Sequence, residues 1–365
     1  MKVLVVSNMY PSEKYPAYGS FVQETVRGLE ELEGMKCQVA AISERKTGLK
    51  NNLLKYSRLF LDTGKALLFS PYDLVNAHYI FPTGFIALAP ALLRGKPLVV
   101  TSHGGDVRLG KKNAPLKALT SLVLKRARRV VAVSDYLARE LEGEFSLPRE
   151  KIEVINCGVD TDKFYPRPRE EALQELNMGI REREEKIVLF VGNLIELKGL
   201  IPLIRAFASL HPSVPEARLV LVGEGPLKER LLQEASSLGI KDRVTFTGPL
   251  PHHRIPLWMS AAHLFVLPSY QEGFGLVALE ALACGTPVVA SRVGGLPEVV
   301  TPDKDGFLVP PGEEKALAEK ILLLLKDEDL HREFSSRARD SALDHDFKKQ
   351  IKRLGEVFYS LKPPS

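Results

Sequence analysis

Short apolar runs rich in β-branched residues alternate with helical patterns along the chain, and this alternation restricts the fold more than any other feature. Nearly continuous apolar strands separated by helices indicate parallel sheets covered by helices on both faces. A chain of 365 residues exceeds one ordinary core, so two domains are expected. The predicted strands are 2–7, 38–43, 74–78, 98–102, 129–134 and 152–155 in the first half, and 187–191, 219–222, 244–247, 264–267, 288–291 and 307–309 in the second.

The fold class that follows is α/β, with two doubly wound Rossmann-like domains facing a central cleft. Helical spacing over 21–32, 85–93, 116–126 and 136–141 separates the strands of the first half, and three helical stretches finish the chain. From Tyr165 to Lys186 the alternation fails, with two prolines and then a charge-rich segment. We expect the chain to cross between domains there.

Composition excludes few classes of function. A net charge of +5 and a pI near 8.9 fit anionic substrates or a membrane surface as well as nucleic acid, and no pattern favours nucleic acid. Cys37, Cys157 and Cys284 form no CxxC and are predicted to be free thiols in a reducing compartment. The apolar start is too short for a signal peptide and 80–93 is too interrupted to span a bilayer, which predicts a cytoplasmic protein, peripheral at most.

The stretch Ser269–Gly285 carries the most chemistry. It follows the strand 264–267, holds Glu272 in a loop, and enters a helix that contains Glu280. Gly273 and Gly275 lie where the chain turns into that helix, and a helix start of this kind leaves N–H groups bare for an anion. Phosphate donors beside carboxylates that bind hydroxyls predict a nucleotide-sugar site.

Other strand ends of the second half share this style. Asn193 follows a strand in the loop 192–199, and Lys198 comes just before a helix, where its ammonium group can neutralise a diphosphate. Gly223 and Gly225 form a second such loop ahead of a proline at the helix start, and 294–298 is similar. Each loop is a weak signal alone, but their recurrence at one sheet edge favours a phosphate-binding site.

Two loops of the first half are also candidates. Gly19 ends a loop that either reaches a phosphate or an acceptor, or simply joins a strand to a helix. No GxGxxG follows the first strand, which argues against a dinucleotide-binding fold built on this half of the chain. His103, with Asp106 behind it, directly follows the strand 98–102. That position favours a histidine that faces a ligand over a structural one.

The segment 45–70 mixes leucines and phenylalanines with lysines and arginines. It is predicted either to lie on an anionic membrane or to contact a lipid-linked acceptor, or else to be a helix that packs on the core with a solvated basic face. Four Asp-x-Asp triplets, at 160–162, 303–305, 327–329 and 344–346, are expected by chance in so charged a chain, and His252-His253 lacks a third ligand. No metal site is predicted.

Taken together, these motifs resemble the retaining glycosyltransferases of the GT-B fold classed as family four. Glu272 and Glu280 match the E-x7-E motif of that family, with Gly273, Phe274, Gly275 and Leu276 between them. The remaining matches are Lys198-Gly199, the Gly223–Pro226 loop, His103 with Asp106, the phrase Gly158-Val159-Asp160 and the closing helix 347–361. In this family the closing helix returns to the first domain, so the implied domains are 1–165 plus about 346–365, on the acceptor side, and 166–345, which binds the nucleotide sugar.

The sequence departs from the family pattern at two places. The family usually has arginine where this chain has Asn193, so one cation for the diphosphate is missing. The phrase before the hinge contains Asn156-Cys157 in place of Pro-Asn, which has no consequence that we can connect to chemistry.

The resemblance implies transfer of a hexose-type sugar from a nucleoside-diphosphate sugar to a glycan or lipid-linked acceptor in polysaccharide biosynthesis, with retention and without a required metal or cofactor. Glu280 would bind ribose hydroxyls, Glu272 the hydroxyls of the sugar, and the amides of Phe274–Leu276 the diphosphate and sugar. Gly19 would approach the diphosphate. His103 would lie near the reacting carbon, and His103 and Asp106 would lie on the acceptor side. A UDP-sugar is favoured over a GDP-sugar. The alternatives are a nucleotide-sugar epimerase of the same fold and a non-catalytic sugar-nucleotide-binding protein.

Overall fold

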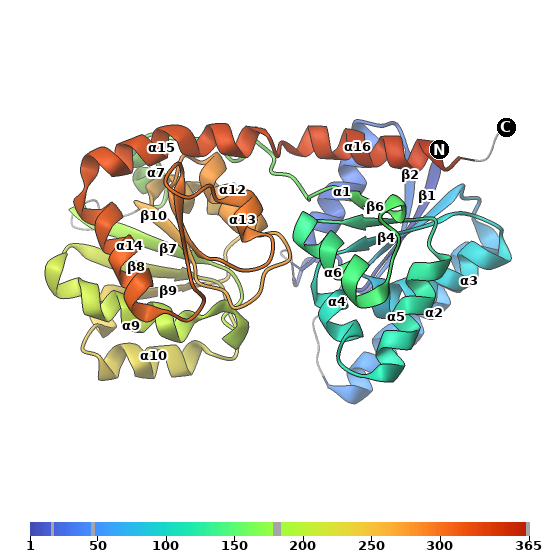
Figure 1. The fold of residues 1–365 in the computed structure, drawn as a ribbon, viewed down its shortest axis with the longest axis horizontal. Helices are drawn as coiled ribbons and strands as arrows, with labels where there is room; N and C mark the ends of the chain where they lie inside the picture. Colours follow the sequence, from blue (N-terminus) through green and yellow to red (C-terminus); the bar gives the residue numbers. More distant parts are fainter. Residues whose placement is uncertain (16–17, 45–47, 178–183, 363–365) are drawn as a thin grey trace. The chain divides into compact units, whose positions relative to one another are not determined.

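The computed structural model describes residues 1–15, 18–44, 48–177 and 184–362. They form two compact units, Met1–Gly158 with Phe347–Ser365, and Val159–Asp346 (Figure 1). Each contains one six-stranded parallel sheet, and all twelve predicted strands are present within a few residues of their predicted bounds. The predicted α/β class is confirmed.

Unit 1 has the strand order β2-β1-β3-β4-β5-β6. The order reverses beside β1, and in such sheets ligands bind at the carboxyl ends of the strands near the reversal. β3 and β4 are buried along their whole length, as strands covered on both faces must be. The strands are β1 (Lys2–Ser7), β2 (Lys36–Ala41), β3 (Leu74–His78), β4 (Leu98–Ser102), β5 (Arg129–Ala132) and β6 (Ile152–Val154); the helices are α1 (Ser20–Glu31), α2 (Leu49–Phe69), α3 (Phe85–Leu93), α4 (Gly105–Gly110), α5 (Ala114–Arg126), α6 (Asp135–Phe145) and α16 (Phe347–Ser360).

The last helix of the chain completes the core of unit 1. α16 lies against α1 (Figure 1), and its Ile351, Leu354 and Phe358 are buried in the same apolar cluster as residues of β1 and α1. Gly28 of α1 allows this approach, because a Cβ there would come within 2.8 Å of the Ile351 side chain. The first unit is therefore built from two segments that are far apart in the sequence.

Unit 2 has the strand order β12-β11-β10-β7-β8-β9, again with every pair parallel. Its central strand β10 is buried at every residue, so the loops at the carboxyl edge stand on a rigid base. The strands are β7 (Lys186–Val191), β8 (Ala217–Val222), β9 (Val244–Gly248), β10 (Leu264–Leu267), β11 (Val288–Ser291) and β12 (Gly306–Val309); the helices are α7 (Arg169–Glu175), α9 (Leu200–Leu210), α10 (Lys228–Ser237), α11 (Ile255–Ala261), α12 (Leu276–Ala283), α13 (Leu296–Val299), α14 (Glu314–Lys326) and α15 (Glu328–Leu343).

The boundary between the units differs from the predicted one. Residues 159–165, which were expected in the first domain, belong to unit 2. Val159 N donates to His345 O at 3.0 Å, and Arg339 of α15 donates to Phe164 O at 3.0 Å, so this segment is tied to the end of unit 2. The expected crossing at 165–186 instead contains α7, which packs on α11 within unit 2, and its residues 178–183 lie outside the described part of the chain.

The largely enclosed imidazole of His263 is expected to make the stability of unit 2 depend on pH. Its Nδ1 accepts a hydrogen bond from Ile187 N at 3.1 Å, which requires an unprotonated nitrogen. Burial, with Arg169 and His331 nearby, lowers the pKa of His263 from 6.5 to about 3. Between these values the unfolded chain binds more protons than the folded one, so stability is lost as the pH falls.

We therefore expect His263 to cost the folded state roughly 3–5 kcal/mol as the pH decreases from about 6.5 to about 3. Urea titrations at several pH values, followed by circular dichroism, measure this loss. His263→Asn is the matched variant, because its amide oxygen can accept the same hydrogen bond without titrating. An equal loss of stability in the variant and in the parent protein would contradict the prediction.

Candidate functional site

The carboxyl edge of the unit 2 sheet brings Lys198 and Glu272 together. Lys198 ends the helical turn η3 (Glu196–Lys198) after β7, and Glu272 lies in the loop after β10. The Lys198 ammonium is ion-paired with Glu272 Oε1, and Ser269 Oγ donates to the same oxygen at 2.8 Å. The side chains are only 20% and 14% exposed, so solvent screens this pair less than an ordinary surface ion pair.

Glycine 294 holds the Glu272 loop in place. It follows β11 with a left-handed φ of 56°, and a Cβ there would run into Glu272 O. Gly295 N donates to the same carbonyl at 3.4 Å. The loop 294–298, which was predicted to resemble a phosphate-binding loop, therefore supports the backbone of Glu272 through packing.

The loops after β7 and β8 also meet through backbone contacts. A side chain at Gly223 would collide with Gly192 O, and one at Gly225 would collide with Leu194 O. Gly223 N already donates to Gly248 O at 2.9 Å. Close packing therefore accounts for both glycines, and their contact with a donor molecule stays a prediction.

The start of α12 offers unused donors beside Glu272. Gly275 precedes the helix with φ 105°, and a Cβ there would lie 2.5 Å from the Leu296 side chain. In the described part of the chain, the backbone N–H groups of Phe274, Gly275 and Leu276 donate no hydrogen bond. Bare N–H groups at the positive end of a helix favour an anion.

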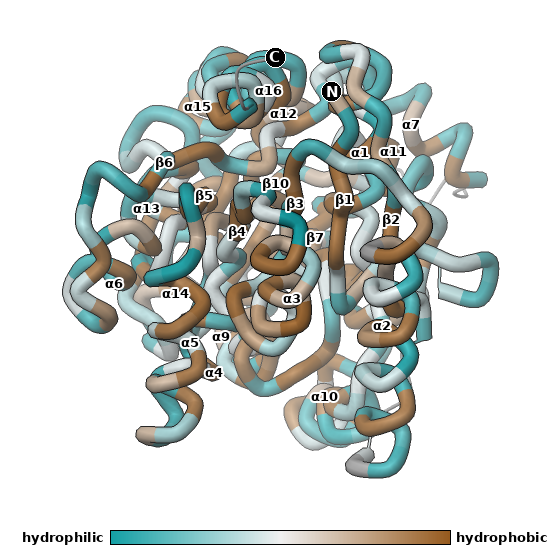
Figure 2. Tube along the Cα trace, turned by 90° about the vertical axis from the view of Figure 1, so that its right-hand side faces the viewer, coloured by the Kyte–Doolittle hydropathy of each residue, from teal (hydrophilic) through white to brown (hydrophobic). Residues whose placement is uncertain are grey.

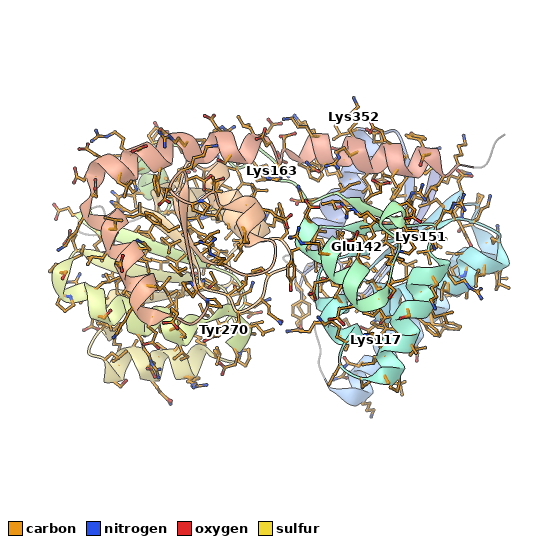
Figure 3. All side chains as sticks on the ribbon, viewed as in Figure 1. Lys117, Glu142, Lys151, Lys163, Tyr270 and Lys352 are labelled. Atoms are coloured by element: carbon orange, nitrogen blue, oxygen red, sulfur yellow. The ribbon has the colours of Figure 1, made fainter. Side chains whose placement is uncertain are left out.

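Glu280 lies one turn further along α12 and is buried. Glu280 Oε1 is 3.4 Å from His252 Nε2, so His252 is a neighbour of Glu280. No zinc site was predicted at this histidine. Asn193, directly after Gly192, is exposed. Tyr270, labelled in Figure 3, stands at the start of the Glu272 loop and is partly exposed. The structure thus places Lys198, Glu272 and Glu280 at one edge of unit 2, together with the backbone N–H groups of Phe274, Gly275 and Leu276, called the α12 amides below.

In unit 1, the carboxyl edge of the sheet carries a pair of histidines. His103 follows β4, and its Nε2 lies 3.1 Å from Nδ1 of His78, the last residue of β3. The rings of Phe21 and Tyr79 flank His103 at centroid distances of 4.7 and 4.9 Å. Burial and the neighbouring His78 hold the pKa of His103 well below 6.5, and burial lowers the pKa of His78 to about 4. Both rings are therefore neutral at neutral pH.

His78 is not among the site residues predicted from the sequence. A usable signal was present, because His78 ends a predicted strand and the carboxyl ends of parallel strands meet at one edge. In the sheet, His78 is in register with Thr101, two residues before His103. That β3 and β4 are neighbours was the missing information.

Asp106 is a buried anchor of the loop that carries His103. Its Oδ1 accepts hydrogen bonds from Ser102 Oγ, Gly104 N and Val107 N at 3.0–3.1 Å. Its Oδ2 accepts one from Ile80 N at 2.9 Å. Burial raises the pKa of this carboxyl, and the hydrogen bonds oppose that effect. Asp106 thus organises the loop rather than offering a free carboxylate to an acceptor.

Gly19 lies at the start of α1 in unit 1. It has a left-handed φ of 76°, and a Cβ there would come within 2.7 Å of the Met9 backbone. Packing of the loop on the segment after β1 therefore accounts for the glycine. The approach of Gly19 to a diphosphate stays a prediction.

The four Asp-x-Asp triplets have structural contacts. Asp160 is ion-paired with Lys163 (labelled in Figure 3) at 2.7 Å, and Asp346 accepts a hydrogen bond from Thr161 at 2.6 Å. Asp305 accepts one from Thr301 N, and Asp327 caps α15. Among the described residues, no three His, Cys, Asp or Glu side chains gather as a ligand set for a metal. The three cysteines form no disulfide.

Two family models match the chain. "Glycosyltransferase Family 4" matches residues 16–163, and "Glycosyl transferases group 1" matches residues 176–341. The N-acetyl-alpha-D-glucosaminyl L-malate synthase of Bacillus anthracis is 32% identical over 79% of this chain and 74% of its own length. The alpha-maltose-1-phosphate synthase of Mycolicibacterium smegmatis is 30% identical over 94% of this chain and 95% of its own.

Solved structures share the fold. The sucrose-phosphate synthase of Thermosynechococcus elongatus superposes with a TM-score of 0.83 at 24% identity, over 99% of this chain and 98% of that chain. The GT-B fold class predicted from the sequence is confirmed. At this level of identity the likeness establishes the architecture and not the substrates.

The substitution Asp106→Asn tests whether Asp106 anchors the loop that carries His103. The amide puts an NH2 group where a buried oxygen now accepts a backbone N–H, so at least one buried donor loses its partner. We expect a loss of about 1–3 kcal/mol in the free energy of unfolding, measured by urea denaturation. Asp329→Asn, at an exposed position of α15, is the control and is expected to change little. An unchanged stability of Asp106→Asn would contradict this assignment.

Proposed function

The chain belongs to the group 1 glycosyltransferases of family four, and on that premise we propose that it moves a hexose-type sugar from a nucleoside-diphosphate sugar to an acceptor with retention of configuration. The observation that supports this proposal best is the Lys198–Glu272 pair beside the unused amides of Phe274–Leu276. It combines a cation and N–H donors for a diphosphate with a carboxylate for sugar hydroxyls.

The same arrangement suggests how the leaving group is stabilised. An ammonium group has three N–H donors, so Lys198 can keep Glu272 and still donate to phosphate oxygens. Fixed donors aimed at the charge that develops on the leaving diphosphate lower the barrier without reorganisation. In this proposal Glu272 binds the hydroxyls of the transferred sugar, and Glu280 binds the ribose.

Retention fits a front-side displacement. The bond from the anomeric carbon to the phosphate oxygen breaks, and its electron pair goes to the phosphate. The acceptor oxygen forms the new bond on the same face, and its proton passes to the leaving phosphate oxygen. Charge stabilisation by Lys198 and the α12 amides makes a metal unnecessary in this scheme.

The donor and the acceptor class are parts of the proposal. We propose a UDP-sugar before a GDP-sugar, and a glycan or lipid-linked acceptor. The names of the two relatives support a small anionic acceptor as a second candidate, because they describe synthases of small anionic products, a glucosaminyl L-malate and a maltose 1-phosphate. Transfer assays with both acceptor classes separate these possibilities.

A thermal-shift screen over nucleoside diphosphates and their sugars tests the donor site, since only a ligand that binds the folded state raises the midpoint. Incubation with the bound nucleotide sugar then separates the functions. Transfer to an added acceptor supports the proposal. An epimerised nucleotide sugar without acceptor would show the alternative enzyme, and binding without hydrolysis or transfer would show a binding protein.

A double-mutant cycle tests the pair. We expect Lys198→Ala to raise the barrier by about 2–4 kcal/mol, measured as kcat, because one stabiliser of the leaving charge is lost. Glu272→Gln should also lower turnover steeply, since a charged contact with the sugar is removed. The two effects should not add, because the side chains are in contact. Lys228→Ala, at an exposed position of α10, is the control. A parent-like rate in either single variant would remove that residue from the mechanism.

The helix α2 supports peripheral contact with a membrane. It packs on the unit through buried Leu59, Thr63 and Ala66, so it is not wholly a surface segment. A second face stays apolar and exposed, with Leu68 at 70% and Phe69 at 82%. The other exposed large apolar residues of α2 and of the end of α3 are Leu53, Leu54, Phe60, Leu61, Leu92 and Leu93.

The charge of this surface matches an anionic membrane. α2 carries four basic residues, Lys50, Lys55, Arg58 and Lys65, against one acidic residue, Asp62. Figure 2 shows α2 and α3 side by side with apolar segments on both. No helix among the described residues has the length and hydropathy to cross a bilayer, whereas residues 45–47 of the predicted segment lie outside that part. We propose that this surface rests on the inner, cytoplasmic face of a membrane.

Flotation with liposomes tests the α2 surface. We expect the protein to float with vesicles that contain anionic lipid, and less with neutral ones. The double variant Leu61→Glu/Leu68→Glu should lower the fraction of protein bound to the vesicles about tenfold or more. Each leucine contributes on the order of 1–2 kcal/mol to binding when it leaves water. Leu238→Glu, an exposed leucine of unit 2, is the control. If the parent protein does not float, or if the double variant floats equally well, membrane contact through α2 is excluded.

A further inference from the structure

The two histidines at the carboxyl edge of unit 1 share one hydrogen bond in the plane of their rings. The ring planes differ by only 14°, the centroids are 5.3 Å apart, and the facing nitrogens are 3.1 Å apart. Nearly parallel rings meet both distances only when they lie edge to edge and almost in one plane. That is the geometry of an N–H···N hydrogen bond, in which the donor N–H points at a ring lone pair.

Two arrangements of the proton satisfy this geometry. Either His78 Nδ1 donates to His103 Nε2, or His103 Nε2 donates to His78 Nδ1. The other nitrogen of His78, Nε2, is buried and has no hydrogen-bond partner among the described residues. In the first arrangement this nitrogen carries only a lone pair, whereas in the second it carries a buried N–H without an acceptor.

Buried unpaired donors are rarer in proteins than under-used acceptors, so the first arrangement is favoured. A charged pair is also disfavoured, because burial lowers the pKa of both rings. His103 is then protonated at Nδ1 and unprotonated at Nε2. The proton of a histidine is set in this way by the partner of its other nitrogen.

We propose that His78 is a positioning residue, which donates Nδ1–H to Nε2 of His103 and thereby fixes His103 in the Nδ1–H tautomer and in its ring orientation. Because the hydrogen bond occupies Nε2, the remaining nitrogen of His103 is an N–H donor. His103 keeps part of its surface exposed, whereas His78 is buried. His78 therefore acts through His103.

The tautomer follows from the geometry of the two rings, whereas the role of His103 in sugar transfer rests on the proposed function. An N–H donor binds an oxygen of the donor or acceptor, but it does not remove a proton. A His103 held in this tautomer is thus unsuited to act as a general base, which agrees with transfer of the acceptor proton to the leaving phosphate. Phe21 and Tyr79 flank the ring and oppose rotation that would exchange its nitrogens.

Long-range ¹H–¹⁵N correlation spectra of the protein labelled with ¹⁵N-histidine test the tautomer directly, since protonated and bare ring nitrogens resonate far apart. The cross-peaks that disappear in His78→Asn and in a separate His103→Gln variant assign the two rings. We expect His103 protonated at Nδ1 and His78 protonated at Nδ1, at neutral pH. His103 protonated at Nε2 would overturn the proposal. This readout needs no activity.

Two variants of His78 separate positioning from mere packing. The amide nitrogen of His78→Asn can take the place of Nδ1–H, whereas His78→Leu has a similar size and no donor. With both variants folded by circular dichroism, we expect His78→Asn to keep the His103 tautomer and most of the turnover. In His78→Leu we expect the tautomer pattern to change and kcat to fall about tenfold or more, by analogy with the partners that orient metal-bound histidines, with little change in the KM of the donor.

The outcomes distinguish the two proposals. An altered tautomer in folded His78→Asn, or an unaltered one in folded His78→Leu, would overturn the positioning role. The predicted tautomers without any transfer by the parent protein would instead reject the proposed function and leave the positioning of His103 supported. If His78→Leu does not fold, the parent spectrum and His78→Asn still decide.

Discussion

Parallel pairing of the strands is the constraint on which the rest of the structure depends, because it puts all carboxyl ends of a sheet at the same edge. Loops that are far apart in the sequence then become neighbours. In unit 2 this brings Lys198, in the loop after β7, to the loop after β10, where Glu272 lies. In unit 1 it brings the end of β3 to the loop after β4.

Glycines let these loops approach closely enough to hold the charged groups in place. Gly294 packs directly on the backbone of Glu272, and Gly223 packs on the loop after β7. A side chain at Gly294 would clash with Glu272 O, and one at Gly223 would clash with Gly192 O. Several glycines that look like phosphate ligands in the sequence therefore have a packing function. The α12 amides are different, because packing leaves their N–H groups unused. This contrast separates the loops whose glycines serve packing from the one that keeps N–H donors unused.

The buried polar groups of unit 1 show the same division between support and contact. Asp106 spends its carboxylate on four hydrogen bonds within the protein, and these bonds shape the loop that presents His103. His78 is buried behind His103 and sets its free nitrogen. A motif that reads as two candidate ligands in the sequence thus becomes one partly exposed histidine, His103, supported by the buried residues Asp106 and His78. Motif matching alone does not separate these parts, because both kinds of residue are polar and close in sequence.

Local patterns in the sequence were sufficient to predict all twelve strands, the α/β class and the family, because apolar periodicity and strand-end motifs depend on neighbouring residues. Contacts between distant residues decided the rest. The boundary of unit 1 lies at Gly158, before the predicted residue 165, because Val159 and Phe164 are hydrogen-bonded to the end of unit 2. The pairing of His78 with His103 depends on which strands are adjacent in the sheet. Strand order and burial are properties of the folded chain, so only the tertiary structure could decide which polar residues are buried in support of a loop and which keep part of their surface exposed.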